Sequence, residues 1–256
     1  MLFGLGYTGV MKKIRLDTLL VERGLFSNVD AAKRAILAHE VKVGDSYAMS
    51  AAQKVTADEQ VTVKGKDRFV SRGGHKLQAA LEEFAFDPTG LSCADVGCST
   101  GGFTDCLLQA GAAHVAAIDV GYGDLAWKLR QDDRVTVFER TNIRVADPVE
   151  LGAPFDLVVA DLSFIGLASL APVFARLCKA GGVFIGLVKP QFESRHDETD
   201  ERGVVNDEEV RLRTVDEVRV ALQEAGFQTQ GVIESPLKGK QSGNVEYLVL
   251  ATKTSE

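Results

Sequence analysis

The stretch C-A-D-V-G-C-S-T-G-G-F at residues 93–103 decides the fold of most of this chain. An apolar run over residues 91–96 ends in a glycine turn, and a helix-like segment over residues 101–110 follows directly. This strand–loop–helix order is typical of α/β nucleotide sites, where glycines let the backbone approach a ligand. A plain glycine turn that only joins a strand to a helix is the alternative interpretation.

Asp95 makes this loop different from a phosphate-binding loop. It ends the expected strand and faces the loop, where its carboxylate would repel a pyrophosphate but suits a cationic or hydroxyl-bearing ligand such as S-adenosylmethionine. Asp119 ends the next expected strand, where a carboxylate can hydrogen-bond the two ribose hydroxyls of such a cofactor. Asn142, after the third strand, is placed where an amide could contact adenine. The residues predicted to bind the cofactor are Asp95, Gly97, Ser99, Thr100, Gly101, Gly102, Phe103, Asp119 and Asn142.

The chain after residue 76 alternates helix-like and strand-like segments, which predicts an α/β fold with a mostly parallel sheet covered on both faces. Helices are expected at 77–86, 101–110, 123–131, 166–179 and 207–225. Strands are expected at 91–96, 114–119, 135–139, 156–160, 182–188, 227–234 and 245–251. The polar residues 192–205 are expected to form a mobile loop. Five parallel strands that finish with a hairpin-like sixth and seventh are the layout of the Rossmann-like methyltransferase fold.

Charged residues stand at the ends of the later strands. Asp161 ends the fourth strand, and Lys189 directly follows the apolar strand 182–188. Ligands in such sheets bind outside the carboxyl ends of the strands, so Asp95, Asp119 and Asp161 are expected to converge on one crevice with Lys189. A lysine in a partly desolvated crevice loses its proton more readily than one in water. A structural salt bridge is the alternative interpretation of Lys189.

Glu246 lies early in the last expected strand, among apolar neighbours, and would need a cationic partner. Lys76, just before the first expected helix of the large domain, could supply one. The sequence therefore predicts that the beginning and the end of this domain meet at the same crevice.

Charge is distributed unevenly along the chain. The net charge is −7, yet residues 1–74 carry 12 basic against 8 acidic residues and the remainder carries 17 against 28. This polarity favours a basic module that contacts phosphates, joined to an acidic body. No segment approaches the roughly 18 to 20 uninterrupted apolar residues of a membrane span. The four cysteines form no C-x-x-C pair, so we expect reduced thiols in a cytoplasmic protein and no metal site.

The N-terminal part predicts a small α+β module of two helices followed by short strands. Its stretches R-L-D-x-L-L-V-E-R-G-L, A-K-R-A-I-L-A and V-K-V-G-D resemble the small RNA-binding fold of ribosomal small-subunit protein four and of many pseudouridine synthases. In that fold a basic helix and the following turn contact structured RNA through phosphates and shape. A structural cap with solvated lysines is the alternative. The predicted RNA-binding residues are Arg15, Lys33, Arg34, Lys42, Arg68 and Arg72.

Four domains or segments follow from these patterns. Residues 1–10 are expected to be a disordered extension before a natural start at Met11. The RNA-binding module is expected over 11–66, a basic linker over 67–75, and the methyltransferase domain over 76–256.

The set Lys76, Asp161, Lys189 and Glu246 resembles the Lys-Asp-Lys-Glu set of the RNA ribose 2′-O-methyltransferases related to the heat-shock protein FtsJ. The stretches S-R-G-G-H-K-L, D-V-G-C-S-T-G-G-F-T-D, D-L-S-F-I, K-P-Q-F-E and K-G-x-x-G-N-x-E-Y-L resemble the TlyA (hemolysin-A-like) family of ribosomal RNA methyltransferases. The sequence departs from that family in its N-terminal extension and in Phe69, where the interdomain linker often has tryptophan.

The resemblance implies methyl transfer from S-adenosylmethionine to the ribose 2′-oxygen of cytidine in ribosomal RNA, on ribosomal subunits and without a metal. The sequence says little about the oligomeric state, for which a monomer is favoured. It gives Lys189 the task of accepting the hydroxyl proton or of stabilising the developing alkoxide. The cation Lys76 would favour proton loss from Lys189, whereas Asp161 and Glu246 would oppose it, so both roles stay open. Asp161 would hold Lys189, and Lys76 and Glu246 would position the ribose.

Three other functions are alternative interpretations of the sequence. A base methyltransferase on the same fold is disfavoured, because the stretch 161–164, D-L-S-F, lacks the prolines of enzymes that methylate exocyclic nitrogens, and no cysteine fits as a nucleophile after a proline. A haemolysin or other membrane-active protein would need a membrane-binding segment, which the sequence lacks. A catalytically idle RNA-binding assembly factor would not need the four-residue set.

Overall fold

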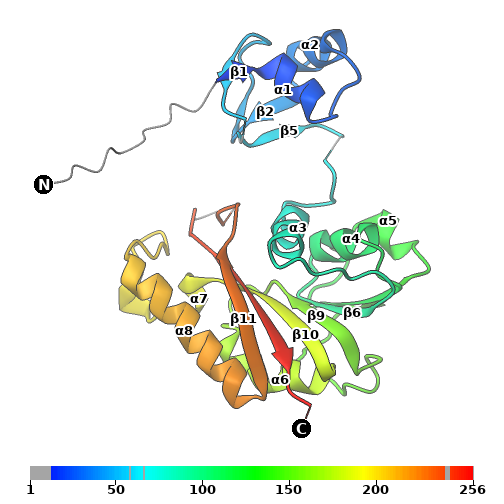
Figure 1. Ribbon diagram of the computed structural model, residues 1–256, viewed down its shortest axis with the longest axis vertical. Coiled ribbons are helices and arrows are strands. Elements are labelled where there is room, and N and C mark those ends of the chain that lie inside the picture. Colours follow the sequence, from blue (N-terminus) through cyan, green and yellow to red (C-terminus); the bar gives the residue numbers. More distant parts are fainter. Residues whose placement is uncertain (1–12, 58, 66, 240–242, 256) are drawn as a thin grey trace, which may run out of the picture. The chain divides into compact units, whose positions relative to one another are not determined.

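The computed structural model describes residues 13–57, 59–65, 67–239 and 243–255. The extension expected at residues 1–10 lies outside the described residues. The chain forms two compact units, Met1–Arg68 and Phe69–Glu256, here called the N-terminal unit and the large unit, each with its own hydrophobic core (Figure 1). The boundary between them falls within the stretch 67–75 that the sequence predicts as a linker.

The N-terminal unit contains the two helices and the small strands that the sequence predicts. Helices α1 (Leu16–Glu22) and α2 (Val29–Leu37) pack around a core that includes Leu20 and Ile36. The side chain of Asn28 accepts a hydrogen bond from the N–H of Ala31 and so caps α2. Strands β3 (Ser46–Tyr47), β2 (Val41–Val43) and β5 (Val61–Val63) form an antiparallel sheet in that order. The short pair β1 (Ile14–Arg15) and β4 (Lys54–Val55) is an addition to the predicted elements.

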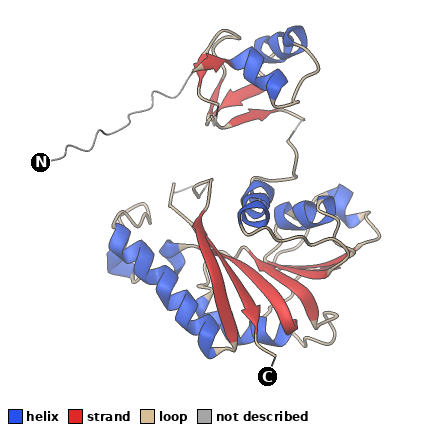
Figure 2. Ribbon diagram, viewed as in Figure 1, coloured by secondary structure: helices blue, strands red, loops and turns tan. Residues whose placement is uncertain are grey.

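A seven-stranded sheet forms the centre of the large unit, in the order β11-β12-β10-β9-β6-β7-β8 (Figure 2). Strands β8, β7, β6, β9 and β10 run parallel, β12 is antiparallel to β10, and β11 is antiparallel to β12. This confirms the predicted fold class. The bounds are β6 Ser92–Val96, β7 His114–Ile118, β8 Val135–Phe138, β9 Phe155–Ala160, β10 Cys178–Val188, β11 Phe227–Glu234 and β12 Tyr247–Lys253.

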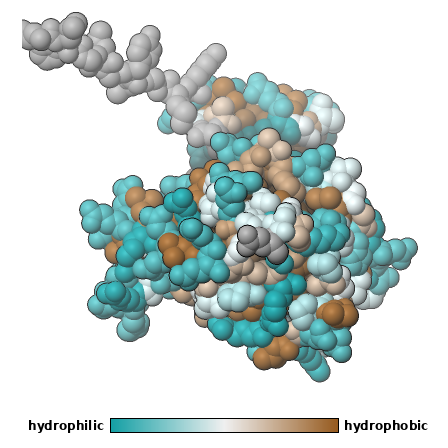
Figure 3. Space-filling view, turned by 60° about the horizontal axis from the view of Figure 1, so that its bottom comes forward, coloured by the Kyte–Doolittle hydropathy of each residue, from teal (hydrophilic) through white to brown (hydrophobic). Residues whose placement is uncertain are grey.

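Helices cover both faces of this sheet, because successive strand residues point to opposite sides. Val158 belongs to the core under η1 (Ala168–Leu170), α6 (Ala171–Leu177) and α8 (Glu208–Glu224). Its neighbour Val159 belongs to the core under α3 (Gly73–Glu83), α4 (Gly102–Gln109) and α5 (Trp127–Arg130). The buried strands are therefore apolar on both sides, and polar residues are left to their ends. On the face seen in Figure 3, apolar residues are scattered among hydrophilic ones.

Several predicted helix boundaries are wrong. The helix expected over 123–131 is limited to Trp127–Arg130, and Cys178 and Lys179, expected at the end of helix 166–179, begin strand β10. Helix α3 begins at Gly73, four residues before the expected start, because packing of the Phe69 ring onto Gly74 overrides the weak helix propensity of two glycines. The expected mobile loop 192–205 holds the end of α7 (Pro190–Glu193) and the turn η2 (His196–Glu198). The buried side chain of Asn244 fixes that segment further, accepting the N–H of Val205 and donating to the carbonyl of Gly203.

Candidate active site

Three strands, β9, β10 and β12, bring three of the four predicted catalytic residues to one end of the sheet. Asp161 directly follows β9, and its N–H donates to the carbonyl of Val96 at the end of β6. Lys189 follows Val188, the last residue of β10, and Glu246 precedes Tyr247, the first residue of β12. Val188 and Tyr247 are ladder partners, so Lys189 and Glu246 lie opposite each other one step beyond the ladder. Asp161, Lys189 and Glu246 therefore lie at the same end of the sheet.

Lys189 and Asp161 form an ion pair that remains partly open to solvent. Lys189 Nζ lies 2.6 Å from Asp161 Oδ1 and 3.3 Å from Ser163 Oγ, to which it donates. The side chains are 11% and 24% exposed, respectively. Both charged groups are therefore held in place and are still reachable by a ligand.

Lys76 and Glu246 form a second ion pair, which is almost sealed from solvent. Lys76 Nζ donates to Glu246 Oε2, and the two side chains are 9% and 3% exposed, so the main difference from the Lys189–Asp161 pair is the buried carboxylate. This is the pairing that the sequence predicts for Glu246. Lys76 lies inside α3, however, and not before it, because α3 begins at Gly73.

Close packing of two helix starts places Lys76. A Cβ added to Gly102, the first residue of α4, would lie 2.9 Å from the backbone nitrogen of Gly74 in α3. Asp105 in the first turn of α4 accepts the N–H of Val70, just before α3, at 2.8 Å. The glycine at 102 thus lets α3 approach α4 closely enough to direct Lys76 to the sheet edge.

The loop after β6 lies directly against Asp161, the residue that follows β9. Gly97 has φ +84°, and a Cβ there would lie 2.7 Å from the carbonyl oxygen of Asp161, so only glycine fits. Asp119 joins this loop to the next one, since Oδ2 accepts the N–H of Ser99 at 2.8 Å and Oδ1 accepts that of Gly121 at 2.7 Å. The carboxylate of Asp119 retains further lone pairs for ribose hydroxyls.

Asp95 differs from its prediction. It is fully buried, and Oδ2 accepts hydrogen bonds from the N–H and the hydroxyl of Thr104 at 2.8 and 2.6 Å, so it holds α4 to β6 instead of facing the loop openly. Burial raises the pKa of Asp95 to about 7 against the opposing effect of the Thr104 bonds. The other oxygen, Oδ1, accepts no hydrogen bond from any described residue.

Some of the remaining predicted cofactor residues stay available to a ligand, and others are engaged within the protein. Ser99 and Thr100 are exposed on the loop, and Gly101 is the N-cap residue of α4. Phe103 packs its ring into the core beneath α3, so only its backbone remains for a ligand. The side-chain oxygen of Asn142 accepts the N–H of Arg144 at 3.1 Å in a local turn, which explains that amide without adenine.

Comparison with known proteins identifies the family. The family described as FtsJ-like methyltransferase matches residues 69–253, almost the whole large unit. The chain belongs to the FtsJ-like methyltransferase family. Its cofactor is S-adenosylmethionine, on which FtsJ-like methyltransferases depend.

Relatives extend the similarity to most of the chain. The 16S/23S rRNA (cytidine-2′-O)-methyltransferase TlyA of Mycobacterium tuberculosis is 46% identical over 246 residues, which are 95% of this chain and 91% of that protein. YqxC of Bacillus subtilis, provisionally named an rRNA methyltransferase, is 44% identical over 93% of this chain and 85% of its own length. A solved structure from Streptococcus thermophilus with a provisional hemolysin name is 37% identical, covers 96% of this chain and 90% of that one, and has a TM-score of 0.73.

The residues at the loop fit the cofactor of the FtsJ-like family. Buried Asp95 Oδ1 has no donor among the described residues, Gly97 lets the loop lie close to Asp161, and Asp119 offers carboxylate lone pairs. Carboxylates around a narrow glycine loop suit a cationic, hydroxyl-bearing ligand. Within the described parts of the chain, no group of three or more His, Cys, Asp or Glu residues could hold a metal ion, and no helix is long and apolar enough to cross a membrane.

Two residues of this FtsJ-like site were not predicted. Phe164 is 89% exposed at φ +68°, and its ring centroid lies 5.5 Å from that of Phe192. Glu193 follows Phe192 and binds the loop that carries Phe164. The stretches D-L-S-F-I and K-P-Q-F-E contain them, but neither exposure nor a long-range hydrogen bond can be deduced from a short stretch.

Four predicted RNA-binding residues of the N-terminal unit lie on β1, α2 and β2. Arg15 pairs with Asp17 at 2.6 Å, and Lys42 Nζ lies 4.9 Å from the centre of the Tyr47 ring. Lys33 and Arg34 lie on α2, whose apolar side faces the core. In the large unit, Arg72 donates to the carbonyl of Lys238. RNA contact by these residues and by Arg68 stays a prediction.

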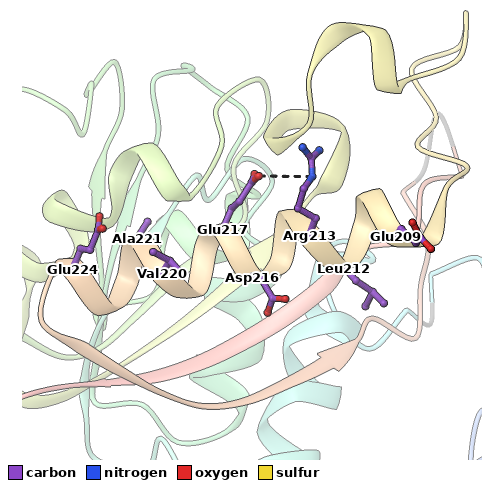
Figure 4. A pocket seen from close by; sticks show the side chains of 8 residues that line it. All are labelled: Glu209, Leu212, Arg213, Asp216, Glu217, Val220, Ala221 and Glu224. Carbon is purple, nitrogen blue, oxygen red and sulfur yellow. Dashed lines mark ion pairs between the residues drawn. The ribbon is translucent and has the colours of Figure 1, made fainter.

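A groove of about 650 Å³ runs along the outer side of α8 (Figure 4). Its lining comes from α8 alone and includes Leu212, Asp216 and Val220. None of the predicted site residues lines it, so it is separate from the methyltransferase site.

Proposed function

We propose that this protein transfers the methyl group of S-adenosylmethionine to the ribose 2′-hydroxyl of cytidine in ribosomal RNA. The observation that carries the proposal is the Lys189–Asp161 ion pair, held beside the cofactor loop at the carboxyl ends of β9 and β10. The names of the Mycobacterium tuberculosis and Bacillus subtilis relatives support this substrate.

The difficulty of the reaction is that a ribose hydroxyl is a weak nucleophile. When bound, S-adenosylmethionine would supply an electrophilic sulfonium methyl group for transfer to the 2′-oxygen, with S-adenosylhomocysteine as the leaving group. Lys189 faces the reacting oxygen, where an ammonium group stabilises developing negative charge and a neutral amine accepts the hydroxyl proton. Asp161 holds the Lys189 amine in one position and so reduces the reorganisation that the reaction needs.

The Lys76–Glu246 pair supports the site from within the protein. Its low exposure leaves little room for direct contact with a ribose, so we assign it the positioning of α3 and the start of β12 around the crevice. It contributes to positioning the ribose, as the sequence predicts, through the shape of the wall that it holds.

The N-terminal unit is proposed to bind RNA. Its basic residues and its small α+β fold fit a module that contacts phosphates of structured RNA. The partners are then ribosomal subunits, and the place of action is the cytoplasm. Unlike the active-site residues, these side chains would affect RNA affinity and its salt dependence but not the chemical step.

The deciding experiment is methyl transfer from labelled S-adenosylmethionine to isolated ribosomal subunits. Wild type is compared with Lys189→Ala and with Lys179→Ala, a control that removes a lysine paired with Asp156 at the same 2.6 Å distance at the other end of the same strands. Label in ribose 2′-O-methylcytidine for wild type and Lys179→Ala, but not for Lys189→Ala, supports the proposal. Cofactor binding without label on either subunit would refute it and favour an RNA-binding factor. Red-cell lysis that survives Lys189→Ala would show a separate haemolytic activity.

A further inference from the structure

Glu193, the last residue of α7, binds a distant loop with its side chain. Its Oε1 accepts the N–H of Leu167 at 2.5 Å, and the N–H of Ala168 also bonds to the carboxylate. These N–H groups open the turn η1 that leads into α6, where backbone donors have no partner within the helix. A side chain far along the sequence therefore completes the start of this helical segment.

The fit between α7 and this loop is tight. A Cβ added to Gly166 would lie 2.4 Å from Glu193 Oε2 and 2.9 Å from the carbonyl oxygen of Phe192. Any side chain at position 166 would push the carboxylate away from Leu167. The sequence thus provides both an acceptor and the space for it.

The two segments joined by Glu193 are those that carry the Lys189–Asp161 pair. The loop begins at Asp161, and α7 begins directly after Lys189. Lys189 also donates to Ser163, and the Phe164 and Phe192 rings meet at 5.5 Å. Glu193 is therefore a second tie between the loop and the lysine, on the side away from the strand ends.

Phe164 shows that this loop needs support. Its φ of +68° lies in the left-handed region, which is unfavourable for a residue with a bulky side chain. Such a conformation persists only where its surroundings hold it. Phe164 is largely exposed, and Leu167, three residues further on, is the point at which Glu193 fixes the loop.

We propose that Glu193 is a positioning residue of the methyl-transfer site, which ties the loop over residues 162–168 to α7 and so fixes Asp161, Ser163 and Phe164 around Lys189. This inference rests on the proposed function, because the role of Lys189 in the reaction does. Glu193 does not touch the reacting atoms and acts through the loop that it holds.

The electrostatic environment indicates that the tie needs an acceptor more than a charge. Burial raises the pKa of Glu193 to about 7 against the effect of the two N–H donors, and Glu217 on α8 raises it further. Glu217 in turn pairs with Arg213 at 3.7 Å (Figure 4). Glutamine, a neutral residue of the same shape with an acceptor oxygen, should therefore replace Glu193 better than alanine does.

Hydrogen exchange tests the tie without any RNA substrate. In wild type and Glu193→Gln, amides within residues 162–170 should exchange slowly, and in Glu193→Ala they should exchange about 10-fold faster or more. Glu198→Ala is the matched control, because Glu198 also accepts a backbone N–H, that of Arg195, but binds no part of this loop. Equal protection of residues 162–170 in wild type and Glu193→Ala would overturn the proposal.

Kinetics then test the positioning role. Glu193→Ala should lower kcat about 10- to 100-fold, with cofactor affinity unchanged and Glu193→Gln close to wild type, since small misplacements at a reacting centre have such effects. Gly166→Ala should reproduce the loss, and the double variant should lose no more than either single one. A parallel fall of kcat, cofactor affinity and melting temperature in Glu193→Ala would overturn the positioning role. Altered exchange in Glu193→Ala, with a wild type that methylates no rRNA, would instead refute the proposed function and leave the tie established.

Discussion

Strands β9 and β10 carry a lysine–aspartate ion pair at each end, and the two pairs have the same length. At the amino-terminal end, Lys179 Nζ lies 2.6 Å from Asp156 Oδ1, and at the carboxyl end Lys189 Nζ lies 2.6 Å from Asp161 Oδ1. The first pair is more exposed, and its carboxylate also accepts the N–H of Ser92. The residue types and the distance are equal, so any difference in role comes from the surroundings.

Those surroundings differ because the two ends of parallel strands are followed by different structures. Loops and helix starts gather at the carboxyl ends, which is where ligands bind in such sheets. There the glycine loop after β6 touches the carbonyl of Asp161, and Asp95 and Asp119 lie on the adjoining strand ends. At the amino-terminal end, the Lys179–Asp156 pair only joins two strands, β9 and β10. The proposed catalytic role of the Lys189–Asp161 pair therefore rests on its place in the topology and not on its geometry alone.

The sharpest way to break the comparison is to remove the charge at the carboxyl end. Lys189→Ala should lower kcat about 10³-fold, because one positioned group stabilises or deprotonates the attacking oxygen. Lys189→Arg separates the two roles, since arginine keeps the positive charge and does not lose its proton in proteins. Activity of Lys189→Arg well above that of Lys189→Ala, in single-turnover methyl transfer, indicates alkoxide stabilisation. Equal loss in both variants indicates proton abstraction, and full activity of Lys189→Ala would contradict any role.

The Lys76–Glu246 pair, at the same end of the sheet, allows a buried ion pair to be compared with the two more exposed ones. Lys76→Met leaves Glu246 buried without its cation, which should lower the free energy of unfolding by about 3 kcal/mol in urea titrations. The double variant Lys76→Met/Glu246→Leu should recover much of that loss, because an apolar pair replaces both charges. A stable double variant that still methylates would restrict this pair to architecture, and a stable but inactive one would assign it to the reaction. If Lys76→Met were as stable as wild type, the expected cost of leaving Glu246 buried without a cation would be contradicted.

The sequence predicts the parts of this site that follow from strand ends, and it misses the parts that follow from packing. Asp161 and Lys189 were predictable because each stands directly after an apolar strand. The Lys76–Glu246 pairing was predictable because a glutamate among apolar neighbours needs a cation. The inward turn of Asp95 toward Thr104 depends on how α4 meets β6, which no spacing reveals.

Contacts between distant segments were equally out of reach. Glu193 meets Leu167 across 26 residues, and Asn244 meets Val205 across 39. Both are polar residues in stretches whose composition indicates only a loop. The same composition predicts a mobile loop over 192–205, in which the structure places η2 and the two Asn244 hydrogen bonds.

Phe164 offers a smaller test on the side of the RNA. The exposed Phe164 ring packs against Phe192, whose ring centre lies 5.9 Å from Lys189 Nζ. Such a ring can stack on a nucleobase, so Phe164→Leu should raise the KM for RNA about 10-fold with little change in cofactor affinity. Phe164→Tyr keeps the ring and should remain near wild type. An unchanged KM in Phe164→Leu would remove the ring from substrate binding.

The smallest effect belongs to the amino-terminal pair, and its dependence on pH is set by Asp156. The Lys179 ammonium holds the pKa of Asp156 below its ordinary value, with the N–H of Ser92 acting in the same direction. A depressed folded pKa means that the stabilisation is present above the ordinary value and disappears as the pH falls through the folded one. Because both side chains are substantially exposed, Lys179→Ala should lower the free energy of unfolding by about 0.5 kcal/mol at pH 7. Wild type and variant should converge in urea titrations as the pH falls through the lowered folded pKa of Asp156. A stability difference that grows on acidification would contradict this prediction. Convergence, combined with full methyl transfer by Lys179→Ala at pH 7, would show that a lysine–aspartate pair joins strands at one end of the sheet and serves the reaction only at the other.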